Sequence, residues 1–284
     1  MRGGNERVGT PPTATRAGGR GTWTPVERTH RKSLTQSQTR CSLHAMSVTA
    51  ARKERERMVR EELMIDHARR LLLKHGYQNL NLDELAGAVE YSKGTIYLHF
   101  STKEDLALAV STRALRERAD LFERASGFQG RSRERMRAIG FACAQFAVHH
   151  RDYFNVEMML KSVSFWEKAS EDRKRNHSHQ ASRCFEAVNR IALDAIKCGD
   201  LPRTHRAEQV TLALIAITMG THCATSQPDL MHLARISDPI SVMRFNQDLV
   251  CDGLGWKPVL ARFDYAATDR RIRAEIFPAA SWLV

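Results

Sequence analysis

The sequence lacks the features that mark membrane and secreted proteins. Its longest apolar run, Val210 to Gly220, is too short to cross a bilayer and is interrupted by threonines. The six cysteines are scattered with no CxxC pair, which is typical of reduced thiols in a cytosolic protein rather than of a disulfide framework. No N-terminal apolar stretch resembles a signal peptide. These absences predict a soluble, cytoplasmic protein with no membrane partner.

Motifs that carry catalysis or hold cofactors are also missing. The chain has no HExxH, GxSxG or Walker-type GxxxxGK[ST] sequence, which removes the common signatures of zinc proteases, hydrolases and nucleotide-binding enzymes. The histidines His149-His150 and His177-x-His179 have no third ligand at helical spacing, so we expect no metal site. We therefore expect no cofactor and no catalytic residue, and an all-α enzyme is the less favoured alternative.

Positive charge is abundant but unevenly distributed. The formal net charge is +12 over 284 residues, which favours a polyanionic partner such as nucleic acid. Residues 1–45 hold eight Lys or Arg and two Glu, so half of the excess lies there. Residues 1–50 are also rich in Gly, Pro, Ser and Thr, a composition that predicts a disordered basic tail. The tail could add affinity for the DNA backbone or be dispensable, and Met46 is an alternative start.

From residue 51 onward apolar residues recur at helical spacing, and no strand pattern is present. The sequence therefore predicts an all-α fold. We expect a three-helix helix-turn-helix DNA-binding domain over 51–118, a helical ligand-binding and dimerisation domain over 119–252, and an unassigned C-terminal tail over 253–284. The expected helices of the second domain span about 131–149, 152–161, 163–198, 204–225 and 237–252.

The most informative segment is Asn81 to Phe100, which reads as two short helices joined by a tight turn. Ala86 lies where the helices would cross, and Ile96 is one of the apolar residues that would face the core. Ser92 is a good N-cap for the second helix, since its hydroxyl can accept a free backbone N–H. Glu90 occupies the turn where such motifs usually have Gly, so a left-handed backbone there would cost about 1 kcal/mol.

This segment resembles the signature of the TetR family of transcriptional regulators. The resemblance is carried by SKGTIYLHF at 92–100, TKEDL at 102–106 and LLLKHGY at 71–77. It implies a homodimer that places the helix 92–100 in the major groove of a palindromic double-stranded DNA operator, most often as a repressor. It also implies that the C-terminal domain binds a small, often apolar ligand. Ser101 and Glu104 further predict a capping box at the start of a linking helix over 101–126.

The motif provides the candidate DNA contacts. Lys93 and Thr95 are predicted to face base edges, because Lys can donate to guanine and the Thr methyl can touch thymine. Tyr97, His99 and Lys103 are predicted to contact phosphates and so to position the helix. Asn81 would add a phosphate contact at its own helix start. The full set is Asn81, Ser92, Lys93, Thr95, Tyr97, His99 and Lys103. Each could instead be a solvated surface residue.

Aromatic and methionine side chains gather in the second domain and mark a candidate ligand pocket. The candidate residues are Phe141, Phe146, Met158, Met159, Trp166 and Phe185. Their role as pocket residues follows from the resemblance, whereas plain core packing is the alternative. In that alternative the protein is a DNA-binding regulator without a ligand, whose pocket is filled by side chains.

The helix over 206–225 is apolar on two faces, so a second surface must cover it. Together with a helix over 239–251, it predicts a homodimer interface, with Ile217 in the apolar contact. The C-terminal tail is the alternative cover.

Overall fold

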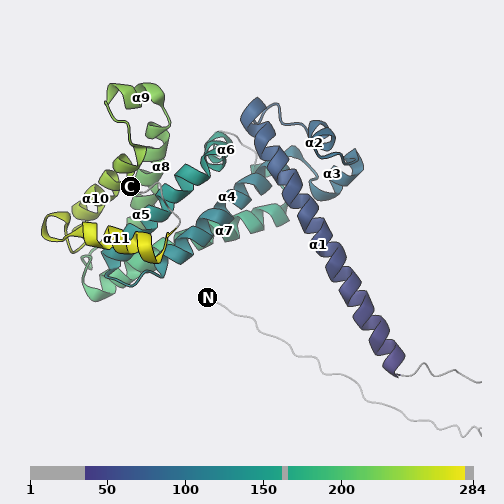
Figure 1. The fold of residues 1–284 in the computed structure, drawn as a ribbon, viewed down its shortest axis with the longest axis horizontal. Helices are drawn as coiled ribbons and strands as arrows, with labels where there is room; N and C mark the ends of the chain where they lie inside the picture. Colours follow the sequence, from purple (N-terminus) through teal and green to yellow (C-terminus); the bar gives the residue numbers. More distant parts are fainter. Residues whose placement is uncertain (1–35, 162–165, 279–284) are drawn as a thin grey trace, which may run out of the picture. The chain divides into compact units, whose positions relative to one another are not determined.

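The computed structural model describes residues 36–161 and 166–278, with side chains over 48–160 and 166–278 (Figure 1). The chain divides into two units, Met1–Lys53 and Glu54–Val284, and the fold considered below is that of the second. All regular elements within the described ranges are helices, as the apolar periodicity predicts. The expected disordered tail over 1–50 lies largely outside the described residues, although the first helix already begins at Gln36.

In chain order the helices are α1 (Gln36–His75), α2 (Leu82–Val89), α3 (Lys93–His99), α4 (Lys103–Ser126), α5 (Ser132–His149), α6 (Arg151–Lys161), the 3₁₀ helix η1 (Trp166–Lys168), α7 (Glu171–Cys198), α8 (Ala207–Thr225), α9 (Pro228–Leu233), α10 (Pro239–Gly253), the 3₁₀ helix η2 (Leu260–Arg262) and α11 (Tyr265–Glu275). Most helices lie where the sequence predicts them, but α9 and α11 were not predicted, and the single helix expected over 163–198 is a 3₁₀ helix followed by α7.

Local capping sets the boundaries of the helix-turn-helix. Gly76, at φ 75°, ends α1 with the left-handed backbone that glycine adopts without strain. The Asn81 side chain accepts the Asp83 N–H at 2.8 Å and starts α2. The Ser92 hydroxyl accepts the Thr95 N–H at 3.2 Å and starts α3, which confirms the N-cap expected from the sequence. The start of α3 is therefore fixed by a contact within its own motif.

Glu90, which ends α2, has the left-handed backbone expected from its place in the turn, with φ 57°. A side chain at positive φ crowds the backbone, whereas glycine does not. We expect Glu90→Gly to raise the free energy of unfolding by up to about 1 kcal/mol, measured by urea unfolding. Glu84→Gly is the control, since it lies inside α2 and should instead destabilise by about 1 kcal/mol. An unchanged or lower stability of Glu90→Gly would show that the turn carries no strain.

The start of α4 differs from the expected capping box. Thr102 is the N-cap, and its hydroxyl accepts the Asp105 N–H at 3.1 Å. Glu104 does not reach back to Ser101 but accepts a hydrogen bond from the Tyr77 hydroxyl at 2.9 Å. Burial and this carboxylate raise the pKa of Tyr77 to about 12. The tertiary bond to Tyr77 thus replaces the local one and ties the end of α1 to the start of α4.

The core runs continuously from the helix-turn-helix into the second domain. Leu72, Leu85, Ile96 and Phe100 are fully buried where α1 to α3 meet the start of α4. α4 then lies along α7 and contacts α5 and α6, while α8 packs on α7 and α10 (Figure 1). α4 is therefore the element that joins the recognition helix to the helical bundle.

The segment after residue 253, which the sequence left unassigned, is an integral part of this bundle. Trp256 is fully buried and donates its indole N–H to the Ser132 hydroxyl at 2.9 Å. Arg133 of α5 donates to the carbonyl oxygens of Trp256 and Pro258 at 2.8 and 2.9 Å. Arg137 of α5 forms a bidentate pair with Asp269 of α11. These bonds fasten α11 to α5 and leave the outer faces of α8 and α10 uncovered by it.

Candidate nucleic-acid interface and ligand cavity

Three of the predicted phosphate contacts lie around one shallow hollow beside the recognition helix. Asn81, Tyr97 and Lys103 line it together with the ends of the loop between α3 and α4. The Lys103 ammonium lies 5.0 Å from the Tyr77 ring centroid and donates to the Gln78 carbonyl at 3.2 Å. An exposed tyrosine, a lysine and an asparagine at one hollow can together donate to an anion.

The two residues predicted to meet base edges lie on α3 with different surroundings. Lys93 is exposed and pairs with Asp83 of α2, with Nζ and Oδ2 2.6 Å apart. Thr95 is half-buried, and its hydroxyl lies 2.9 Å from that of Ser92. Lys93 would therefore have to leave Asp83 to reach a base, whereas Thr95 would present its methyl group.

His99 departs from its expected role. Its side chain is only 5 % exposed, and Nδ1 lies 3.2 Å from Oε2 of Glu61 on α1. Glu61 also pairs with Arg173 of α7 at 2.6 Å, and the same guanidinium donates to the His99 carbonyl at 2.9 Å. Burial raises the pKa of the Glu61 carboxyl, but Arg173 and His99 outweigh this effect and hold that pKa below its usual value. His99 is thus part of an internal bridge and does not face a phosphate.

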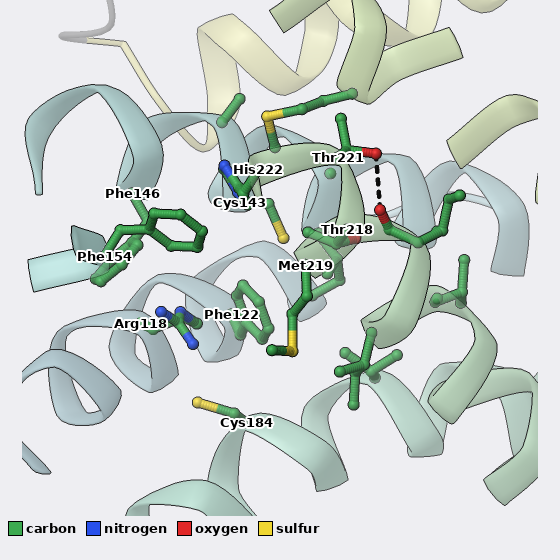
Figure 2. Close-up of a pocket in the computed structure, with 18 of the residues that line it drawn as sticks. Arg118, Phe122, Cys143, Phe146, Phe154, Cys184, Thr218, Met219, Thr221 and His222 are labelled. Atoms are coloured by element: carbon green, nitrogen blue, oxygen red, sulfur yellow. Dashed lines mark hydrogen bonds between the residues drawn. The ribbon is translucent and has the colours of Figure 1, made fainter. Parts of the chain in front are cut away.

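A cavity of about 640 Å³ lies among the helices α4 to α8 and α10 (Figure 2). Four of the six residues predicted for the pocket line it: Phe141, Phe146, Met158 and Phe185. Met159 and Trp166 do not line it. Trp166 is 41 % exposed in η1 and meets the ring of His177 edge-on, with the centroids 5.3 Å apart. The aromatic pattern therefore located the cavity but included two residues outside it.

The cavity also holds polar side chains that the sequence did not single out. Arg118 of α4 and Glu157 of α6 form a bidentate ion pair in its wall, and the guanidinium lies over the Phe146 ring at 4.4 Å from the centroid. His222 of α8 packs on Phe154 with the ring centroids 4.4 Å apart. Burial, followed by repulsion from Arg118, lowers the pKa of His222 to about 4, so the imidazole is neutral near pH 7. An apolar cavity with few polar groups is the usual form of a small-molecule site.

The outer faces of α8 and α10 carry large apolar side chains exposed to solvent. Leu212 is 62 % exposed, Phe245 66 % and Leu249 57 %. The two helices pack on each other, and we call their exposed apolar residues the α8/α10 face. Ile217, expected at the dimer contact, instead lines the cavity. A charge at Ile217 would therefore test the cavity rather than the face.

No helix within the described residues is both long and apolar enough to span a membrane. No three His, Cys, Asp or Glu side chains in that part of the chain lie close enough together to hold a metal ion.

Residues 64–110, which span the end of α1 to the middle of α4, match the family described as bacterial regulatory proteins, tetR family. The HTH-type transcriptional activator FasR of Mycolicibacterium smegmatis is 26% identical over 154 residues, covering 54% of this chain and 66% of FasR. The chain thus spans just under two thirds of that relative's length.

Solved structures share the fold over most of the chain. A regulatory protein of the tetR family from Rhodococcus RHA1 superposes with a TM-score of 0.55 at 18% identity, covering 69% of this chain and 97% of that one. The transcriptional regulator FadR of Bacillus subtilis, solved with stearoyl-CoA, superposes with a TM-score of 0.54 at 15% identity. The match covers 67% of this chain and 97% of FadR. The match over residues 64–110 identifies a helix-turn-helix of the tetR type in this chain, and the solved structures show that the fold is shared beyond it.

Proposed function

We propose that the protein is a homodimeric repressor that is released from a palindromic operator when a small, mostly apolar molecule enters the cavity. The observation that carries this proposal is the course of α4. Its first residue, Lys103, borders the hollow beside the recognition helix, and Arg118 and Phe122 further along it line the cavity. A ligand that moves α4 would therefore change the position of α3.

In this proposal Thr95 and Lys93 read base edges, while Asn81, Tyr97 and Lys103 hold phosphates. Ser92 acts by capping α3. His99 is left out, because its ring is buried against Glu61.

The ligand part of the proposal is supported by the size and lining of the cavity. Its volume of about 640 Å³ lies within the range of about 300 to 1,000 Å³ that is usual for small-molecule sites. The similar fold of FadR was solved with stearoyl-CoA, a molecule with a long apolar chain. An effector can weaken DNA binding only if it prefers one arrangement of the helices over the other. A typical coupling of about 1–3 kcal/mol corresponds to a loss of affinity of about 5- to 150-fold.

The recognition helix can be tested with two substitutions. An operator is first selected from a randomised DNA pool, and affinities are then measured at matched salt. Tyr97→Ala is expected to weaken binding to all sequences about equally, by about 1 kcal/mol, because it removes a phosphate contact. Thr95→Ala is expected to change sequence preference, with an effect of about 1–3 kcal/mol at one base pair.

Lys197→Ala, at the exposed end of α7 and far along the chain from the motif, is the control for removing a surface residue. Parent-like binding and preference in both variants would show that α3 does not enter the groove as proposed.

A further inference from the structure

The two buried arginines that line the cavity, Arg118 and Arg137, are already paired with carboxylates, whereas the other charged lining residues, Glu186 and Arg244, are exposed or partly exposed. Arg118 and Glu157 form a bidentate pair, with one N–O separation at 3.3 Å and the other shorter. Both oxygens of the Glu157 carboxylate are engaged by Arg118. Neither member of this pair offers an uncompensated charge to a ligand.

The second basic group in the wall is neutralised as well. Arg137 pairs with Asp269 at 2.9 Å through Nη2 and with both oxygens of Asp248 at 2.9 Å through Nη1. Arg244 lies 4.0 Å from Asp269, and Arg133 pairs with Asp252. Arg244 also lines the cavity, but its side chain is 37 % exposed, so its charge remains in contact with water. A charged ligand entering here would have to compete with existing pairs, and an unpaired charge in apolar surroundings is strongly disfavoured.

Two polar side chains in the wall are open to a ligand. Thr218 and His222 lie one turn apart on α8 and both line the cavity (Figure 2). Within the part of the chain that the structure describes, no hydrogen bond is made by the His222 ring nitrogens or by the Thr218 hydroxyl, although His222 is only 9 % exposed. Two further polar groups of the wall are engaged: His177 with Ser111 at 3.2 Å, and Asn246 with Thr221 at 2.8 Å.

We propose that the effector is an uncharged, largely apolar molecule with one hydrogen-bonding group, such as a hydroxyl or carbonyl, which His222 and Thr218 bind. This inference rests on the proposed function, because it specifies the ligand of the same cavity. A neutral imidazole and a threonine hydroxyl can each donate or accept, so they suit a neutral polar group. The apolar remainder of the ligand would lie against Phe141, Phe146 and Phe185.

The test compares three probes with the same ten-carbon chain at pH 7.5: 1-decanol, which is neutral, decanoate, which is an anion, and decylammonium, which is a cation. Each displaces the hydrocarbon dye 1,6-diphenylhexatriene from the full-length protein. We expect decanol to bind at least about tenfold more tightly than either ion, because each ion would bury a charge without a free partner. If decanoate or decylammonium bound as tightly as decanol or more tightly, the proposal that the effector is uncharged would be wrong.

The role of His222 is tested with a matched pair of variants. His222→Phe keeps a ring against Phe154 and removes both nitrogens. It is expected to weaken decanol binding about fivefold while leaving the dye bound as in the parent. His177→Phe is the control, since it makes the same change in the same cavity at a histidine that already bonds Ser111, and should keep the preference for decanol. Thr218→Val provides a second variant on the α8 side.

The outcomes separate this inference from the proposed function. If neither the dye nor any of the three probes bound, the proposed function of the cavity as a ligand site would be wrong. Binding of the dye with an undiminished decanol preference in both His222→Phe and Thr218→Val would keep the cavity and overturn the assigned residues.

Discussion

Phe245→Arg is expected to disrupt the proposed dimer and to reduce operator affinity by about 100-fold or more. Phe245 belongs to the α8/α10 face, as Leu212 and Leu249 do, and all three are largely exposed. A guanidinium brought against the same face of a second subunit would be buried without a partner, which costs several kcal/mol. A monomer would then hold only one half-site of a palindrome. Light scattering gives the mass, and titration of the selected operator gives the affinity.

Leu193→Arg is the matched control for this experiment. Leu193 is an exposed leucine on α7 rather than on α8 or α10, and charging it should leave both mass and operator affinity unchanged. A folded parent protein that is already a monomer at micromolar concentration would refute the dimer. So would a Phe245→Arg variant that stays dimeric.

Arg137→Met should lower the free energy of unfolding by about 3–5 kcal/mol, since it removes one member of a buried ion cluster. Asp248 on α10 and Asp269 on α11 would lose the cation that both now bind, and the two carboxylates would be left in a poorly hydrated site. Arg137 keeps its proton under all ordinary conditions, because the hydrogen bonds to Asp269 and Asp248 raise its pKa despite burial. Urea unfolding followed by circular dichroism measures the change.

Arg135→Met tests whether burial is what makes the cluster important. Arg135 lies on the same helix and pairs with Asp194 at 3.0 Å, but Asp194 is well exposed. Such a surface pair is worth about 0–1 kcal/mol, so the variant should be close to the parent. Similar losses in both variants would mean that the Arg137 cluster contributes no more than an exposed ion pair.

The sequence allowed prediction of those features that depend on neighbouring residues. Asn81 and Ser92 cap their helices as expected, because the capping hydrogen bond spans only two or three residues. Glu90 takes the left-handed turn that its position requires. The cap of α4 was misplaced by one residue, since Glu104 found a partner in Tyr77, 27 positions earlier, which no local rule could reveal.

The polar part of the cavity escaped prediction for a related reason. Phe141, Phe146 and Met158 stood out because large apolar residues in a helical region are normally buried. Arg118, Glu157 and His222 read as ordinary surface residues, and their burial depends on each finding a partner on another helix. His99 was assigned to the DNA surface by its position in the motif, but Glu61 and Arg173 draw it inward.

The bridge of Arg173 to Glu61 and His99 limits how short a fragment of this chain can be and still fold stably. A fragment ending at residue 118 contains every helix of the DNA-binding motif but lacks Arg173. In that fragment the Phe100 ring, now 4.8 Å from the guanidinium carbon of Arg173, would be left open to water, and the Glu61 carboxylate would lose its strongest partner. The smallest part of this chain that folds stably should therefore extend well beyond the motif, at least through the first turns of α7.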